Sequence, residues 1–302
     1  MSKTISLALL LCLCSGPKFQ TRDFFSLGAA CRIKISKGHS SLIDSAIVEC
    51  RRIEKKFSLF DTCSEIYRLN QAGIIADSEL ARLINNSIKV CSLTNGRYDI
   101  TCEPLVRLWG FYENSFRVPK KGEIVKILKK VDYQKLRISG DTIILSGTRL
   151  DLGSLIQGYA ADRVVEMLKR NKVKEALVDI GGEIFAYGRR WRIGIKDPRS
   201  ATKVIDAVDL EGAIGTSGDY ENFFIKDGVR FHHLFDAKTG MPSRRSISTT
   251  VIARDCITAD LLSTALFIVG PDSGKAIAKD LKVDAMWVDG KQKITKTVGF
   301  ND

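Results

Sequence analysis

Asp260 and Thr264 are the residue pair whose types and spacing are best suited to chemistry. They stand four apart in the segment Ala259 to Val269, whose apolar pattern predicts a helix. Side chains four apart share one face of a helix, so a carboxylate and a hydroxyl would present their oxygens together. Hard oxygens of this kind suit Mg²⁺, which keeps open positions for substrate phosphates. By spacing alone, a capping Asp and a Thr bonded to its own helix are the commoner explanation.

A second group of residues is suited to an anion such as a phosphate. A short strand predicted at Leu150 to Leu152 is followed by glycines and by a helix predicted at Gln157 to Lys169. The N–H groups at a helix N-terminus attract anions, and glycine lets the backbone come close to them. Gly181-Gly182 follows a strand predicted at Ala176 to Ile180 in the same way. These segments match neither GxGxxG nor a Walker loop, and a tight turn is the alternative for the glycine pair.

Three further stretches are too polar or too rich in glycine to be simple core. The first runs from Phe60 to Asn70, and a loop with a helix cap is its alternative explanation. The second runs from Gly96 to Phe111, and a buried aromatic turn accounts for much of it. The third runs from Gly215 through His232-His233 to Pro242 and precedes the helix of Asp260.

The elements that must position these residues do not follow the regular βαβ order of a Rossmann sheet. Further strands are predicted at Phe25 to Ile35, Trp191 to Ile195, Val204 to Leu210, Ala213 to Ser217, Ile247 to Ile252 and Ala285 to Val288. Further helices are predicted from Ser40 or Ser41 to Phe57, at Ser78 to Leu93, at Gly122 to Val131 and at Asp272 to Leu281, with a hairpin at Leu136 to Leu145. Since no linker divides the chain, we expect an α+β fold, a single compact layered domain over residues 21–302 with mixed or antiparallel sheets and packed helices.

The composition is that of a soluble, folded chain. The 302 residues suit one large domain or two small ones, with 44% hydrophobic and 27% charged residues. The net charge of +12 could attract nucleic acid, an anionic membrane or an anionic substrate. The positive residues are scattered in short pairs such as Lys55-Lys56, and no nucleic-acid module is recognisable, so we expect no nucleic-acid binding. The eight cysteines form no pair of CxxC motifs, which argues against a zinc site.

Residues 1–20 have the pattern of a signal or lipoprotein leader. Lys3 precedes the apolar run Ile5 to Leu13, which is too short to span a bilayer as a helix. Leu11-Cys12-Leu13-Cys14 resembles a loose lipoprotein processing box, with Cys14 or Cys12 as the lipid-bearing residue. We therefore expect export to the periplasmic side of the inner membrane in a bacterial cell envelope, with peripheral attachment through lipid. A hydrophobic N-terminus on a cytoplasmic protein is the alternative.

Taken together, the polar segments resemble the ApbE family of FAD:protein FMN transferases. The resemblance covers nearly all of residues 25–300, with the motifs in order. They are Phe60-Asp61, Ser64-Glu65 and Leu69-Asn70; Tyr98-Asp99, Pro104-Leu105 and Leu108-Trp109-Gly110-Phe111; Asp151-Leu152-Gly153, Gly158-Tyr159-Ala160, Asp162 and Asp179-Ile180-Gly181-Gly182; and Thr216-Ser217-Gly218-Asp219-Tyr220, His233, Asp236, Thr239-Gly240, Asp260 and Thr264-Ala265-Leu266. Each motif alone is weak, but the combination is specific. The resemblance implies an ApbE or T-fold-like architecture.

The resemblance also implies roles for individual residues. Asp260 and Thr264 would bind Mg²⁺ together with the backbone carbonyl of Ser154. His233 is the residue best suited to handle a proton, because histidine changes charge near neutral pH, and it joins Asp260 as a catalytic candidate. The positions implied to contact FAD are Leu27, Phe60, Arg97, Tyr98, Asp99, Asp151, Gln157 and Leu234.

The reaction implied by the resemblance moves FMN from FAD to a threonine hydroxyl of an acceptor flavoprotein and releases AMP. Mg²⁺ would neutralise the charge of the pyrophosphate, which otherwise repels the nucleophile. The implied acceptor is a subunit of a membrane electron-transport complex, such as a sodium-pumping NADH:quinone reductase. Two alternatives stay open: a Mg²⁺-dependent FAD pyrophosphatase, in which water attacks, and a flavin-binding lipoprotein without turnover.

Four positions depart from the residues that are frequent in the family. Phe60 replaces tyrosine, Gln157 replaces lysine, Ser154 replaces glycine or alanine, and Glu183 replaces asparagine. The first two changes remove a hydroxyl and a cation, so they bear on flavin affinity and on the balance between transfer and hydrolysis. The third matters little, because the implied metal contact uses the backbone carbonyl.

Overall fold

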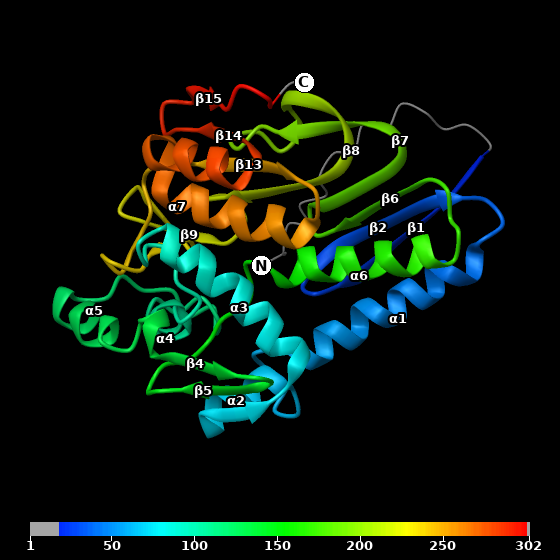
Figure 1. The fold of residues 1–302 in the computed structure, drawn as a ribbon. Coiled ribbons are helices and arrows are strands. Elements are labelled where there is room, and N and C mark those ends of the chain that lie inside the picture. The colour runs from blue at the N-terminus through cyan, green and yellow to red at the C-terminus, as the bar shows by residue number, and fades with distance from the viewer. Residues whose placement is uncertain (1–17, 301–302) are drawn as a thin grey trace.

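An eight-stranded antiparallel sheet supports the rest of the molecule (Figure 1). In the computed structural model, which describes residues 18–300, its strand order is β1-β2-β6-β7-β8-β13-β14-β15. The strands are β1 (Phe19–Ser26), β2 (Ala29–Ser36), β6 (Ala176–Ile180), β7 (Glu183–Lys196), β8 (Val204–Gly218), β13 (Ser248–Ala253), β14 (Asp284–Val288) and β15 (Ile294–Lys296). Most of the predicted leader, with Cys12 and Cys14, lies outside the described residues.

The first hairpin corrects one prediction from the sequence. Phe25 to Ile35, predicted as one strand, contains the turn between β1 and β2. Leu27 and Gly28 have φ values of 54° and 73°, in the left-handed region that a two-residue hairpin turn uses. The apolar pattern continues through this turn, so it does not mark the reversal of the chain.

Two other segments also differ from the sequence prediction. Leu150 to Leu152 is irregular rather than a strand, and the neighbouring Arg149 forms only an isolated bridge with Cys102. The strands predicted at 204–210 and 213–217 are one long strand, β8, which runs through Gly212. Gly212 has a φ of 136° and pairs with Ala186 of β7, and Ala213 pairs with both β7 and β13, so the glycine bends the strand without ending it.

Three long helices cover one face of the sheet (Figure 1). They are α1 (Ser40–Phe57), α6 (Ile156–Arg170) and α7 (Cys256–Leu281). Their apolar sides pack against the sheet in the main core, which contains Ile33, Val178 and Phe267. Gly270 has non-helical angles (φ 72°, ψ 177°) and precedes Pro271, so α7 is broken into the two helices that the sequence predicts.

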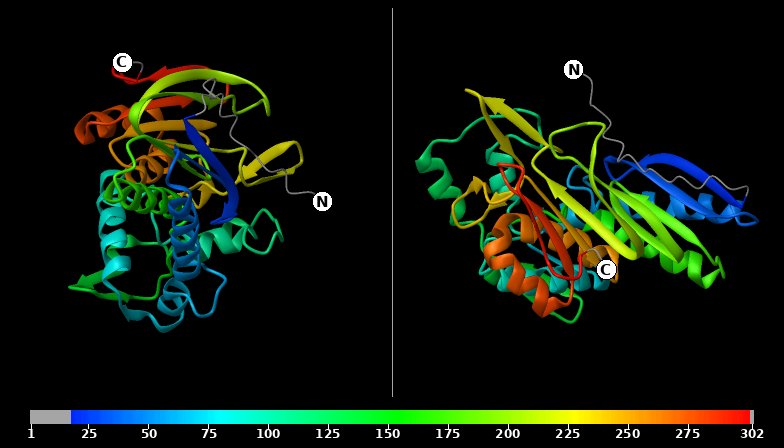
Figure 2. Two further views of the ribbon diagram at one scale, coloured as in Figure 1. Left: turned by 90° about the vertical axis from the view of Figure 1, so that its right-hand side faces the viewer. Right: turned by 90° about the horizontal axis from the view of Figure 1, so that it is seen from above.

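A second lobe lies beyond the helix layer. Sheet, helices and lobe follow one another from top to bottom in Figure 1 and in the left view of Figure 2. It contains α2 (Glu65–Ala72), α4 (Glu103–Leu108), α5 (Lys121–Leu128), the 3-10 turn Tyr133–Lys135, and a small sheet of β3 (Ile74–Ala76), β5 (Thr142–Leu145) and β4 (Leu136–Ser139). The hairpin predicted at 136–145 is confirmed by β4 and β5. Helix α3 (Ser78–Leu93) connects the lobe to α7.

The segment between β8 and β13 forms two short hairpins. They are β9 (Phe223–Lys226) with β10 (Val229–His232), and β11 (Phe235–Asp236) with β12 (Met241–Pro242). Every pair of named strands in residues 18–300 is antiparallel, and the predicted α+β layered fold is confirmed. Within these residues, no helix combines the length and the apolar character needed to cross a membrane.

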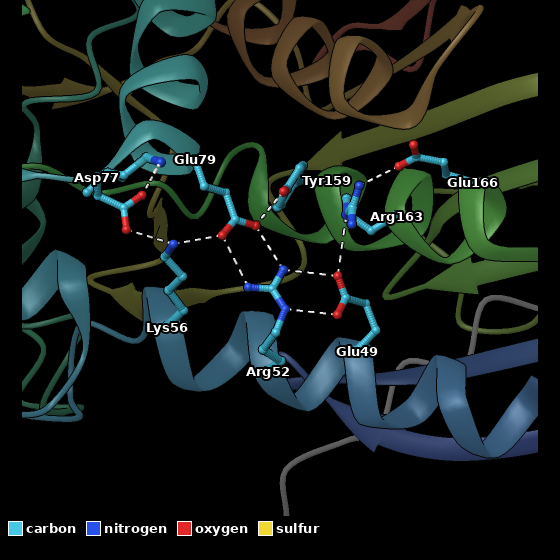
Figure 3. A network of polar contacts seen from close by, with 9 residues as sticks. Glu49, Arg52, Lys56, Asp77, Glu79, Tyr159, Arg163 and Glu166 are labelled. Carbon is cyan, nitrogen blue, oxygen red and sulfur yellow. Dashed lines mark hydrogen bonds and ion pairs between the residues drawn. The ribbon is translucent and has the colours of Figure 1, made fainter. Parts of the chain in front are cut away.

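A charged network ties α1, α3 and α6 together (Figure 3). Glu79 of α3 accepts hydrogen bonds from Arg52 and Lys56 of α1 and from the Tyr159 hydroxyl of α6. Burial alone would raise the pKa of Glu79, but these three donors outweigh it and lower the pKa to about 2. Arg52 also donates to Glu49, at 2.8 Å from Nε to Oε2. The network therefore ties α1 and α6 of the helix layer to α3 through paired charges.

Candidate active site

The turn at 150–155 lies where the lobe meets the helix layer, and side chains of the lobe fix its position. Asn70 Oδ1 accepts a hydrogen bond from Leu150 N at 2.7 Å, and Asn70 Nδ2 donates to Leu150 O at 2.9 Å. The hydroxyls of Tyr98 and Ser154 are 2.6 Å apart. The turn therefore depends on residues that are 50 to 80 positions earlier in the chain.

Asp151 is fixed through both of its carboxylate oxygens. Oδ1 accepts from Gly153 N at 2.7 Å, and Oδ2 accepts from the Tyr112 hydroxyl at 2.6 Å. The Tyr112 ring meets Phe60 edge-on, with centroids 5.8 Å apart. Phe60 and Asp151, both implied to contact FAD, are thus neighbours of one side chain that the sequence did not single out.

Asp260 lies on α7 and faces the N-terminus of α6. Its Oδ2 accepts a hydrogen bond from Gly158 N at 2.9 Å, and the residue is only 6% exposed. A Cβ on Gly158 would lie 2.3 Å from Cys256 O and 2.8 Å from the Asp260 Cβ. Gly158 therefore serves the close approach of two helices, which is a reason for a glycine that the phosphate hypothesis did not include.

Asp162 connects the same two helices one turn further along α6. Its carboxylate accepts from Cys256 N at 2.8 Å and from Ile257 N at 2.9 Å, so it caps the start of α7. Burial raises the pKa of Asp162 to about 6. Asp162 thus belongs to the structural support of Asp260.

Thr264 lies one turn after Asp260 and faces strand β8. Its hydroxyl is 2.8 Å from Ser217 Oγ, which in turn is 2.7 Å from Ser263 Oγ. Within the described residues, the Thr264 hydroxyl is not hydrogen-bonded to the carbonyl of Asp260. The commoner explanation from the sequence, a Thr bonded to its own helix, therefore does not hold. The side chain is instead part of a row of hydroxyls between α7 and β8.

The carboxyl groups around Asp260 have no cationic partner among the described residues. Burial raises the pKa of Asp260 to about 7, and Asp162 adds to the rise. Glu183 is buried, its pKa is raised well above the ordinary value by burial and by Asp260, and its Oε2 has no hydrogen-bond partner in the described part of the chain. A buried, unpartnered carboxyl oxygen beside Asp260 is an arrangement that a divalent cation would stabilise.

The donor set fits Mg²⁺ better than a metal with a protein-made cage. Within residues 18–300, no group of three or more His, Cys, Asp and Glu side chains is arranged to hold a metal ion. Mg²⁺ needs only one or two carboxylates, because substrate phosphates and water complete its coordination. Within the described residues, the Asp260 side chain accepts one hydrogen bond, through Oδ2, so Oδ1 is left for a ligand. Burial raises the pKa of Tyr98 well above its ordinary value, with a smaller contribution from Asp260, and the Tyr98 hydroxyl is 2.6 Å from Ser154 Oγ.

His233 lies on the aromatic side of this region. Its ring is 6.4 Å from the ring of Phe111, and its Nδ1 is 3.1 Å from Asn222 O. A carbonyl only accepts, so Nδ1 carries the proton and Nε2 keeps its lone pair. Burial lowers the pKa of His233, while Asn222 and Asp151 act in the opposite direction. The imidazole is therefore neutral at pH 7 and able to accept a proton through Nε2.

Leu27 and Gln157 are adjacent at the other end of the turn. Gln157 Nε2 donates to Leu27 O at 3.2 Å. The amide lies against Gly181, where a Cβ would come within 2.7 Å of it. Gly181 has a φ of 71°, so the glycine serves both a left-handed turn and the packing of Gln157.

Arg97, Asp99 and Leu234 are engaged mainly with the protein itself. Arg97 forms an ion pair with Asp236. Asp99 accepts from Thr101 N at 2.8 Å and from Tyr133 N at 2.9 Å, and it borders a separate cavity of about 540 Å³. Leu234 is buried in the main core. The structure therefore brings Phe60, Tyr98, Asp151, Ser154 and Asp260 to one junction, whereas Asp99 borders the separate cavity.

The architecture defines an α+β protein whose candidate residues gather at the junction of helix layer and lobe, and solved structures share this fold. The ApbE protein of Thermotoga maritima is similar with a TM-score of 0.87 and 34% identity, over 93% of this chain and 98% of that one. The flavin transferase ApbE from Vibrio cholerae is similar with a TM-score of 0.82 and 27% identity, over 93% and 98% of the two chains.

The sequence matches the ApbE family over residues 27–287, and the chain belongs to this family. A FAD:protein FMN transferase of Vibrio cholerae is 32% identical over 84% of this chain and 80% of its own length. A FAD:protein FMN transferase of Treponema pallidum is 27% identical over 91% of this chain and 86% of its own. The family predicted from the motifs is confirmed.

Proposed function

We propose that this protein is an enzyme that transfers FMN from FAD to a threonine hydroxyl of an acceptor flavoprotein, with Mg²⁺ and with release of AMP. Relatives named FAD:protein FMN transferases match most of the chain and support the transfer. The observation that carries the metal-dependent part is the buried carboxyl of Asp260, which has no cationic partner among residues 18–300 and stands one turn from the Thr264 hydroxyl.

The metal would be held by Asp260, Thr264 and the Ser154 carbonyl. When bound, Mg²⁺ supplies charge neutralisation for the FAD pyrophosphate. The chain's own contribution is to fix Asp260 through Gly158 N, so that the carboxylate faces the site in one orientation. Phe60, Asp151 and the residues around Gln157 would bind the flavin and adenosine parts of FAD.

The transfer step forms one phosphorus–oxygen bond and breaks another. The threonine oxygen attacks the phosphorus of the FMN half, and the bond from that phosphorus to the bridging oxygen breaks, so that AMP leaves with the bridging oxygen. His233 Nε2 would accept the proton of the threonine hydroxyl, as its neutral state allows. The product is FMN joined to threonine through a phosphoester.

The place of the reaction follows from the leader and the acceptor. A leader over residues 1–20, lipidated at Cys14 or Cys12, would attach the domain at 21–302 to the periplasmic side of the bacterial inner membrane. There it would meet an acceptor subunit of a membrane electron-transport complex. Globomycin-sensitive processing and labelling by a palmitate analogue in the native host would test this attachment, and a soluble periplasmic form would contradict it.

A direct experiment tests the transfer. Purified protein is incubated with FAD, Mg²⁺ and an acceptor subunit, with and without EDTA, and the acceptor is analysed by mass spectrometry. We expect an FMN-sized mass gain on a threonine only when free metal is present. AMP and free FMN without modification of the acceptor would identify a pyrophosphatase instead, and unchanged FAD would identify a flavin-binding protein without turnover.

A further inference from the structure

Tyr112 joins three segments of the candidate site that are far apart in the sequence. Its hydroxyl donates to Asp151 Oδ2 at 2.6 Å. Its ring meets Phe60 at an interplanar angle of 78°, and the Arg107 guanidinium lies over it, 5.2 Å from the centroid. One side chain thus contacts two of the residues proposed to bind FAD.

The hydroxyl contact restricts Asp151. The carboxylate can only accept, so the tyrosine donates its proton into the bond. Burial and the nearby Asp151 raise the pKa of Tyr112 well above its ordinary value, so the hydroxyl stays protonated. Because Gly153 N already holds Oδ1, the second bond to Oδ2 leaves the carboxylate no freedom to rotate. Its remaining lone pairs then point in fixed directions.

The ring contact restricts Phe60. This side chain is 68% exposed, which is unusual for an aromatic residue on a polar loop. Its edge-on partner is Tyr112, and such pairs prefer one geometry over a freely turning ring. The exposed face of Phe60 is therefore presented at a set angle beside Asp151.

We propose that Tyr112 is a positioning residue of the FAD site: it orders Phe60 and Asp151 into one preformed surface, an aromatic face for a planar ring and an acceptor for an N–H or O–H of the ligand. The inference rests on the proposed function, since it assigns this surface to FAD. A surface ordered before binding avoids the entropy cost of ordering two side chains when the ligand arrives, so its loss weakens binding.

Two substitutions separate the two contacts. Tyr112→Phe keeps the ring and removes the hydroxyl, and we expect about a 10-fold rise in the Kd for FAD, as measured by quenching of flavin fluorescence. Tyr112→Ala removes both contacts, and we expect about a 100-fold rise. In steady-state kinetics the loss falls on KM for FAD more than on kcat. Tyr187→Phe is the matched control, because it removes a hydroxyl that donates to Val173 O at 3.1 Å on the sheet; its Kd should equal that of the wild type.

A double-mutant cycle tests whether the hydroxyl acts through Asp151. In an Asp151→Ala background, adding Tyr112→Phe should leave the Kd for FAD unchanged, because the partner is already gone. A Kd for Tyr112→Phe equal to that of the wild type, or a full additional loss in the double variant, overturns the inference. Failure of the wild type itself to bind FAD has a different signature and overturns the proposed function together with it.

Discussion

Helix α6 lies between two groups of acidic residues that differ in their partners. On its α1 and α3 side, Glu49 of α1 and Glu79 of α3 are each paired with arginine or lysine (Figure 3). Toward α7, Asp162 and Asp260 accept hydrogen bonds from backbone N–H groups, and neither forms a salt bridge with a lysine or arginine of the described chain. The pKa of Glu79 falls to about 2, whereas that of Asp260 rises to about 7.

The difference separates a structural cluster from the site proposed to bind the metal. Carboxylates removed from water need compensating charge or hydrogen bonds, and the cluster around Glu79 obtains them from its own chain. Asp260 and Glu183 lack a compensating cation among the described residues, which the protein tolerates at a cost in stability. An external cation would supply the missing charge. Charge balance, rather than the number of acidic residues, thus indicates which side of α6 is functional.

The largest effect is expected for Asp260→Ala, on the side of α6 without paired cations. Because this carboxylate is the only charged group proposed to hold Mg²⁺, we expect FMN transfer to fall by about 10³-fold or more. Binding of Mn²⁺, followed by its paramagnetic resonance signal, should be lost in parallel. The matched control is Glu79→Gln on the paired side of α6, which should keep Mn²⁺ binding. Activity within tenfold of the wild type in Asp260→Ala would assign the metal to other residues.

Glu79→Ala tests the paired side. It leaves Arg52 and Lys56 without their shared acceptor, and we expect a loss of about 3 kcal/mol in the free energy of unfolding, measured with urea. The rate of FAD consumption per folded molecule should stay within about twofold, since Glu79 does not face the pocket. A stable variant with impaired turnover would show that the network serves the chemistry directly.

The contributions of Glu79 and Asp260 to the free energy of unfolding should change with pH in opposite directions. The folded pKa of Glu79, about 2, is below its ordinary value of 4.5, so its stabilisation is present above pH 4.5 and is lost as pH falls toward 2. The folded pKa of Asp260, about 7, is above its ordinary value of 3.8, so its folded state is favoured at low pH and loses stability as pH rises through 7. At about 1.4 kcal/mol for each pKa unit, the two contributions are about 3 kcal/mol for Glu79 and about 4 kcal/mol for Asp260. The free energy of unfolding of the metal-free protein can be measured with urea from pH 3 to pH 8. It should depend less on pH in the acid range in Glu79→Gln, and less on pH near neutrality in Asp260→Asn.

The smallest effect is expected for the loss of a single hydroxyl in the network around Glu79. Tyr159→Phe removes one of the three donors to Glu79 and keeps the ring, so we expect a loss of about 1 kcal/mol in unfolding free energy. Combined with Glu79→Gln, the loss should be less than additive, because both changes affect one network. Full additivity would show that the hydroxyl stabilises α6 in some other way.

Much of the fold was accessible from the sequence because its helices are amphipathic and well bounded. The predicted helix Ser78–Leu93 matches α3 to the residue, since Asp77 caps it and its apolar side packs into the core. The hairpin turn at Leu27-Gly28 was not predicted, because a leucine in the left-handed region leaves no compositional signal. The sequence does not predict helix α2: Phe60 to Asn70 is identified only as a polar stretch, with a loop and a helix cap as its alternative explanation. Ser64 accepts from Tyr67 N at the start of this helix, but its eight residues show little more than two turns of periodicity.

The site was predictable as a set of residues but not as a geometry. The motifs locate Asp151, Ser154 and Asp260, yet nothing in them shows that Tyr98 and Tyr112 hold the turn between these residues. Those contacts cross from lobe to helix layer, and only tertiary packing creates them. The same limit applies to Asp99, which stands in a motif. Its carboxylate accepts hydrogen bonds from Thr101 and Tyr133, and the sequence does not predict these contacts.

The hydrogen bonds between α6 and α7 make the proposed metal site part of the folded framework. Gly158 N orients Asp260, and Asp162 fixes the first turn of the helix that carries it, so neither helix can shift without the other. An ion arriving from solvent therefore meets an anchor that already has its final orientation. Metal affinity and resistance to unfolding should consequently rise or fall together in variants at this helix pair, which makes thermal melting in the presence of Mn²⁺ a sensitive probe of the site.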